Sequence, residues 1–272
     1  MTDSPEELRA YVDVWWEAVN DFTAFLDKVP PERWHAPSDL PGWDVHAIVA
    51  HTAHLESLLA GNEHDDVEIG DAPHARGMMG QFTEQGVVAR RDRSPDDLLN
   101  EIRNSTTARH TDLLAEPPTD PAAPAPGLFG AIGWDTRTLL RNRPLDVWMH
   151  EQDVRRALAL PGSMDTAAAE HSTTYLAASL GFVLAKKVGA APGTSLLLEV
   201  EGHAPVGVVV TPEGRGQLLE AAPADPTVGL RTDRESFIVL AGGRRRPDAG
   251  RVEIFGDQAL GQRLLDQLAV TP

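Results

Sequence analysis

Hydrophobic residues recur with helical spacing through the first part of the chain. In residues 4–29 they follow the period of an amphipathic helix, and the pattern predicts one there. Ser4 and Glu7 at its start have the spacing of a capping box. A second run of this kind covers residues 45–59, and Asp44 is placed to cap it. The pattern therefore predicts two helices within this stretch.

The helical pattern continues in three further stretches. Residues 75–114 form one helical region that breaks near Ser94 and Pro95, where Ser94 and Asp97 have the pattern of a new helix start. Residues 136–160 and 165–188 are predicted to form two more helices. The chain up to about residue 190 is therefore expected to be all helical.

Prolines interrupt this helical part at two places. Residues 117–126 contain five prolines with glycines close behind, which predicts an irregular connection or a lid. Pro144 lies within the run 136–160 and indicates either a kink or the first turn of a helix. Neither feature changes the expected fold class.

After Gly193 the hydrophobic pattern changes to short stretches that favour β-strands. Four such stretches are expected, at residues 195–200, 207–211, 216–220 and 251–255. Helices are predicted between and after them, at residues 234–240 and 258–268. We therefore expect two domains, an all-α domain over residues 1–190 and a small α+β domain over residues 191–272.

Composition and charge narrow the possible functions. The 272 residues are 42% hydrophobic and 24% charged, which is typical of a globular protein. The formal net charge of −17, most of it in the first 190 residues, makes nucleic acid an unexpected partner. The chain has no cysteine, signal-peptide pattern or long apolar run, so we expect a cytoplasmic protein with no membrane partner. Any reactive thiol must come from another molecule.

Candidate chemistry is concentrated on two of the predicted helices. Asp146 and His150 are four residues apart, so both side chains leave the same helical face. His51 lies in an apolar row of the helix 45–59 and is expected to face the interior. Two imidazoles and one carboxylate are typical of a catalytic zinc or similar site with open positions. Spacing alone equally allows an ordinary intrahelical pair and a hydrogen-bonded core histidine.

Two further groups near these positions have open interpretations. Asp153 is placed either to orient His150 or to pair with a neighbouring arginine, Arg155 or Arg156. The turn that contains Arg244 and Arg246 is either a solvated loop or a contact for an anionic substrate. Dinucleotide-binding, P-loop, HExxH and nucleophile-elbow motifs are all absent from the sequence.

The same segments carry a resemblance to a known family. The stretch Pro41-Gly42-Trp43-Asp44-Val45 leading to His51, the stretch 146–155, and the tail 237–268 resemble mycothiol-dependent maleylpyruvate isomerase-like proteins. The resemblance implies a DinB-like four-helix bundle of up-down-down-up type and a sterol-carrier-like C-terminal domain. It also implies one divalent metal, usually zinc, held by His51, Asp146 and His150. Family members more often have glutamate where this chain has Asp146.

The resemblance implies an activity as well. A low-molecular-weight thiol, mycothiol or a similar one, would bind at the metal and act as a nucleophile on a small electrophile. The enzyme would then be an isomerase or an S-transferase, with Arg244 or Arg246 as candidates to hold substrate carboxylates. A metal-dependent hydrolase and a non-catalytic metal-binding protein are the alternatives. The expected assembly is a monomer or a homodimer.

Overall fold

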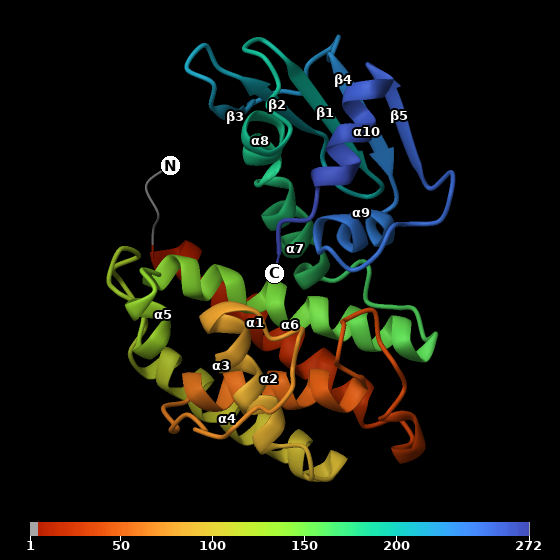
Figure 1. Cartoon of the computed structure of the whole chain (residues 1–272). Helices are drawn as coiled ribbons and strands as arrows, with labels where there is room; N and C mark the ends of the chain where they lie inside the picture. The colour runs from red at the N-terminus through yellow and green to blue at the C-terminus, as the bar shows by residue number, and fades with distance from the viewer. Residues whose placement is uncertain (1–4, 272) are drawn as a thin grey trace. The chain divides into compact units, whose positions relative to one another are not determined.

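The computed structural model describes residues 5–271 and divides into two compact units (Figure 1). The first unit extends to Gly162 and the second begins at Ser163. The hydrophobic pattern places the boundary near residue 190, whereas the Cα packing groups the helical residues after Ser163 with the sheet. Helical spacing cannot reveal this, because it shows that a helix has an apolar face but not which partner covers it.

The first unit is helical, as predicted. Its elements are α1 (Pro5–Leu26), η1 (Pro31–Arg33), α2 (Val45–Leu59), α3 (Gly77–Ala89), α4 (Pro95–Ala115), α5 (Gly127–Ala131) and α6 (Thr136–Leu158). Both α1 and α2 pack against α4 and α6, so these four long helices close a ring, and α3 also packs on α2 (Figure 1). Large buried side chains fill the interior, among them Trp15, Phe22, Ile48, Leu98 and Trp148.

The helix starts follow the sequence signals. Asp44 caps α2 by accepting a hydrogen bond from the backbone N–H of Ala47. Ser94 and Asp97 form the predicted capping box, which confirms the break between α3 and α4. Ser4, the other predicted cap, lies outside the described residues.

The proline-rich segment is irregular, as expected, but its end differs from the prediction. The short helix α5 follows Pro126, and Phe129 within it packs in a cluster with Leu55 and Leu139. Pro144 lies well inside α6, so it does not mark a first turn. A proline at this position removes one backbone N–H from the helical ladder, and α6 continues through it because its face is held by packing.

The second unit combines helices with a five-stranded sheet. Its elements are α7 (Ala167–Ala177), α8 (Leu180–Phe182), the π-helical turn η2 (Val183–Lys187), β1 (Ser195–Val200), β2 (Val206–Val210), β3 (Gly216–Leu218), β4 (Val228–Thr232), α9 (Arg234–Ala241), β5 (Val252–Gly256) and α10 (Gln258–Gln267). The strand order is β3-β2-β1-β4-β5, and only the β1–β4 pair is parallel. The predicted helix 165–188 is thus three shorter pieces, of which α7 packs on α9.

Strand β4 lies inside the sheet, between β1 and β5, yet the sequence pattern does not predict it. It is short, follows Pro226 closely and contains Gly229, so its residues have the composition of a loop. Gly229 lies opposite Phe255 of β5, and a Cβ atom there would lie 2.0 Å from Cζ of the phenylalanine ring. The glycine that weakens the strand signal is therefore required by the aromatic ring across the strand pair.

The core of the second unit is apolar. Leu196 and Leu198 of β1, Leu230 of β4, Phe237 of α9 and Leu264 of α10 are all buried. Within the described part of the chain, no helix has the length and hydrophobicity needed to cross a lipid bilayer.

Candidate metal centre

Helices α2 and α6 carry polar side chains into the interior of the first unit. Every residue from position 45 to position 57 of α2 is buried, and so is most of α6 from Arg143 to Val154. A helix buried on all sides must satisfy any polar side chain within the protein. The histidines and acids of these two helices therefore depend on one another.

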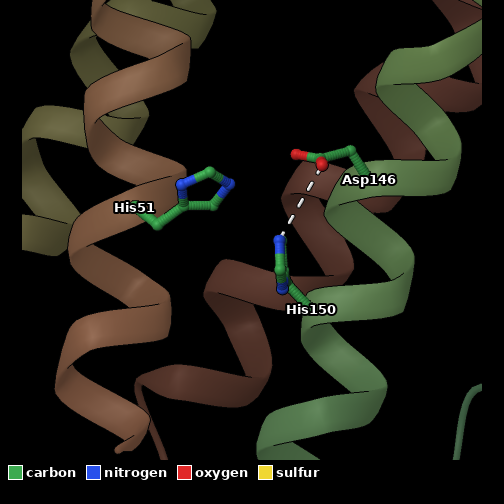
Figure 2. A group of neighbouring side chains, drawn as sticks. All are labelled: His51, Asp146 and His150. Carbon is green, nitrogen blue, oxygen red and sulfur yellow. Dashed lines mark ion pairs between the residues drawn. The ribbon is translucent and has the colours of Figure 1, made fainter. Parts of the chain in front are cut away.

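His51, Asp146 and His150 lie together between α2 and α6 (Figure 2). Each offers one ligand atom, and these three atoms all lie within 4.8 Å of one another. The ring centroids of His51 and His150 are 4.9 Å apart, with the rings edge to face. The structure thus brings together the three residues that the sequence analysis singled out.

His51 is a buried imidazole without a hydrogen bond among the described residues. One of its ring nitrogens points toward Asp146 and His150 (Figure 2). Burial lowers the pKa of His51 well below its ordinary value, and the neighbouring His150 lowers it further. The ring is therefore neutral near pH 7 and has a lone pair available. The prediction of an ordinary hydrogen-bonded core histidine does not apply here.

His150 is held in one orientation by a second acid on the same helix. Its Nδ1 lies 3.2 Å from Oδ2 of the buried Asp153, so we assign the ring proton to Nδ1. Asp153 also accepts a hydrogen bond from Arg156, so both roles predicted for this acid are present. The other ring nitrogen of His150, Nε2, faces Oδ1 of Asp146 at 3.8 Å.

Asp146 is an anion in this site at neutral pH. Burial alone would raise its pKa, but the charge of Arg143 outweighs this and, with the two histidines, lowers the pKa to about 2. Nη1 of Arg143 donates to Oδ2 of Asp146 at 2.9 Å. A carboxylate oxygen and an imidazole nitrogen that face each other at 3.8 Å suit a cation between them.

A buried ion-pair cluster lies directly behind Asp146. The side chain of Glu56 is fully buried and accepts hydrogen bonds from Arg143, at 2.7 Å and 3.2 Å, and from Nε1 of Trp15 at 3.2 Å. Arg109 contacts the other oxygen of Glu56 at 3.4 Å and lies over the Trp15 ring. Sequence reasoning did not find this cluster. The spacing of Arg143 and Asp146, three residues apart on one helix, was the only local signal.

The ring of Trp43 lies beside both histidines of the cluster. Its ring centroid lies 4.8 Å from that of His51 and 6.2 Å from that of His150. Its indole N–H donates to Oε2 of the buried Glu84 at 2.8 Å, and His74 contacts the same oxygen at 3.0 Å. Trp43, which directly precedes the cap residue Asp44 of α2, is therefore held in place as one wall of the site.

The remaining candidates lie elsewhere. His54 is buried one turn after His51 but contacts His64 at 3.1 Å, and burial lowers its pKa to about 3. In the second unit, Arg246 forms an exposed ion pair with Asp266, and Arg244 donates to Thr271. These contacts hold both arginines to their own unit, and their predicted role with substrate stays a prediction.

The donor set fits a divalent ion. Two imidazoles and one carboxylate leave coordination positions free, which distinguishes catalytic from structural sites. With no thiolate and only one carboxylate, the set suits zinc and other first-row divalent metals better than calcium. Asp153 behind His150 and Arg143 behind Asp146 are the outer partners such a site requires.

Comparisons with known proteins agree with the resemblance found in the sequence. Residues 15–155 match the family model for the mycothiol maleylpyruvate isomerase N-terminal domain, and residues 170–263 match that for the MDMPI C-terminal domain. The fold is similar to crystal structures of a mycothiol-dependent maleylpyruvate isomerase and of a mutant of it, with TM-scores of 0.55 and 0.57. Each match has 18% identity and covers 93% of this chain and 95% of the other. Comparison with curated protein sequences finds no match.

Proposed function

This chain belongs to the mycothiol maleylpyruvate isomerase family, and on this premise we propose that it is a metal-dependent isomerase that acts through a low-molecular-weight thiol. The substrate is a small electrophile with a conjugated double bond, and mycothiol is the first thiol to test. The observation that carries the metal requirement is the arrangement of His51, Asp146 and His150.

The three side chains are prepared to hold a cation. Asp146 is charged at neutral pH, while the burial of His51 keeps its ring neutral. His150 faces Asp146 through Nε2, while its Nδ1 contacts Asp153.

A divalent ion held there supplies one chemical function: it lowers the pKa of a bound thiol, so that the thiolate forms near neutral pH. His51, Asp146 and His150 fix its position, and Trp43 shields the histidines on one side. Because the chain contains no cysteine, the reacting sulfur belongs to the cosubstrate.

The isomerisation consumes nothing. The thiolate sulfur forms a bond to one carbon of the conjugated double bond, and the electron pair moves into the adjoining carbonyl. The former double bond is now single and rotates. When the sulfur leaves with its electron pair, the double bond forms again in the other geometry, and the thiol is recovered.

Metal analysis of the purified protein is the first test. We expect about one divalent ion per chain in the unmodified protein. His51→Ala and His150→Ala should each lower metal content and thiol-dependent turnover by more than ~100-fold. Loss of a residue that only hydrogen-bonds a metal ligand has a smaller effect. The solved relative is a maleylpyruvate isomerase, so maleylpyruvate is the first electrophile to assay.

His46→Ala is the matched control. His46 is also a buried histidine of α2, but its Nε2 contacts the backbone carbonyl of Arg93 and it lies outside the cluster. Its loss should leave metal content unchanged. Metal-free protein with full turnover would contradict the proposal. Turnover that needs metal but no thiol would instead indicate the hydrolase that the sequence left as an alternative.

A further inference from the structure

Arg143 joins the candidate metal centre to the buried acid behind it. Its side chain is 1% exposed, and its guanidinium contacts two carboxylates at once. Nε and Nη2 donate to Oε1 of Glu56, and Nη1 donates to Oδ2 of Asp146 at 2.9 Å. Three of its five N–H donors are therefore committed to acids on two different helices.

The two oxygens of Asp146 have different partners as a result. Oδ2 accepts from Arg143, while Oδ1 faces Nε2 of His150 at 3.8 Å. Oδ1 is the oxygen that faces the His150 ring, as the dashed line in Figure 2 shows. An oxygen that accepts a short charge-assisted hydrogen bond is a poor ligand, because the guanidinium competes for its lone pairs.

Arg143 cannot easily release Oδ2. Its partner Glu56 is fully buried and is held in turn by Trp15 and Arg109. The guanidinium is thus fixed between two acids and stays charged, and turning away from Asp146 would leave part of that charge buried and unpaired.

We propose that Arg143 is a positioning residue that limits Asp146 to one coordinating oxygen and so keeps a coordination position open for the thiol. This inference rests on the proposed function, since it assumes an ion at His51, Asp146 and His150. Carboxylates can bind metals through one oxygen or through both. Binding through both would use one of the positions that thiol and substrate need.

The test compares metal binding with thiol binding. Unmodified protein, Arg143→Lys and Arg143→Gln are loaded with Co²⁺, and mercaptoethanol is titrated while the sulfur-to-cobalt charge-transfer absorption is recorded. Lysine cannot span both acids as the guanidinium fork does, so Oδ2 becomes available to the ion in both variants. We expect Co²⁺ affinity to stay equal or rise, while thiol affinity falls on the order of 10-fold.

A purely structural role would give a different result. If Arg143 only supports the fold, Co²⁺ affinity and thiol affinity should fall together, and that outcome overturns the inference. Unchanged thiol affinity in both variants overturns it as well. Arg90→Lys is the matched control, because Arg90 is an equally buried arginine of the same unit that pairs with Asp65 and Glu101. It should resemble the unmodified protein in both titrations.

A second measurement needs no variant. X-ray absorption of the unmodified cobalt protein detects the carboxylate carbon at short distance when both oxygens coordinate. If this carbon signal is absent, the inference is supported. If the signal is present, the inference is overturned, even if the Arg143 variants fail to fold. If the unmodified protein binds no Co²⁺ at all, the proposed function fails first. If it binds Co²⁺ but Asp146 chelates through both oxygens, only the role of Arg143 fails.

Discussion

The two units of this protein bury very different side chains. The interior of the first unit contains ionisable groups, including Glu56, Arg143, His150 and Asp153, together with large apolar residues. In the second unit, the buried polar residues among those described carry hydroxyls, namely Ser172, Thr173, Thr232 and Ser236. The side chain of His203 is also covered there, and it contacts the exposed Glu170. The first unit is thus built around charge, and the second around apolar packing.

The difference shows where chemistry is expected. Burying charges is expensive, and apolar residues of similar size would often give an equally stable core. Perturbed pKa values cluster at functional sites for this reason. Those of His51 and Asp146 are both lowered, but burial lowers the pKa of His51, whereas the charge of Arg143 lowers that of Asp146 against the effect of burial. The apolar second unit shows no such cost, so its stability should depend on volume and shape instead.

Removing the acid at the centre of the charged cluster should have the largest effect on stability. Glu56→Ala leaves Arg109 without its buried partner and Arg143 with only Asp146. We expect the free energy of unfolding to fall by ~3–5 kcal/mol, measured by urea denaturation.

Glu199→Ala in the second unit is the matched control, because it also removes an acid that pairs with an arginine. Glu199 pairs with Arg231, but that pair is exposed on the sheet surface, so its loss should hardly change stability. Equal losses in the two variants would break the distinction between the units.

A volume change should be the more damaging type of substitution in the second unit. Gly229→Ala places a methyl group against the Phe255 ring, and such overpacking costs ~1–3 kcal/mol. A double-mutant cycle with Phe255→Val checks the cause, since the shorter side chain gives the methyl group room. If Gly229→Ala costs as much in the Phe255→Val background as in the unmodified one, the clash is not the reason.

The smallest expected effect is a pH dependence specific to the first unit. Burial, Arg90 and His64 lower the pKa of His54 to about 3, so the folded protein keeps this ring neutral. Below about pH 6.5 the unfolded chain takes up a proton that the folded chain does not, so stability is lost as pH falls, by up to ~1.4 kcal/mol per pH unit.

Urea denaturation at about pH 7.5 and about pH 5.5 tests this sign. His54→Gln should lose less stability than the unmodified protein between these two conditions. His51 stays in both proteins, so its own contribution cancels in the comparison. Identical losses would exclude His54 as a source of the pH dependence.

Local signals in the sequence predicted much of the candidate site. Asp146 and His150 are one turn apart, so their spacing alone placed them on one face of α6. His51 was found because it lies in an apolar row of a helix. Arg143 and Glu56 are 87 residues apart, and no local pattern could pair them. The roles of Asp153 stayed open for another reason: His150 and Arg156 are each three residues from it on α6, and spacing alone does not choose between them.

The sequence by itself determined the helical first part, the later change to strands, the caps at Asp44 and Ser94, and the lack of any internal thiol. These features depend on residues within a few positions of one another, or on composition. Only the tertiary structure decided that α7 packs on α9, that β4 lies between β1 and β5, and that Arg143 pairs with Glu56. Each of these depends on contacts between distant segments, where burial and hydrogen-bond pairing outweigh local preference.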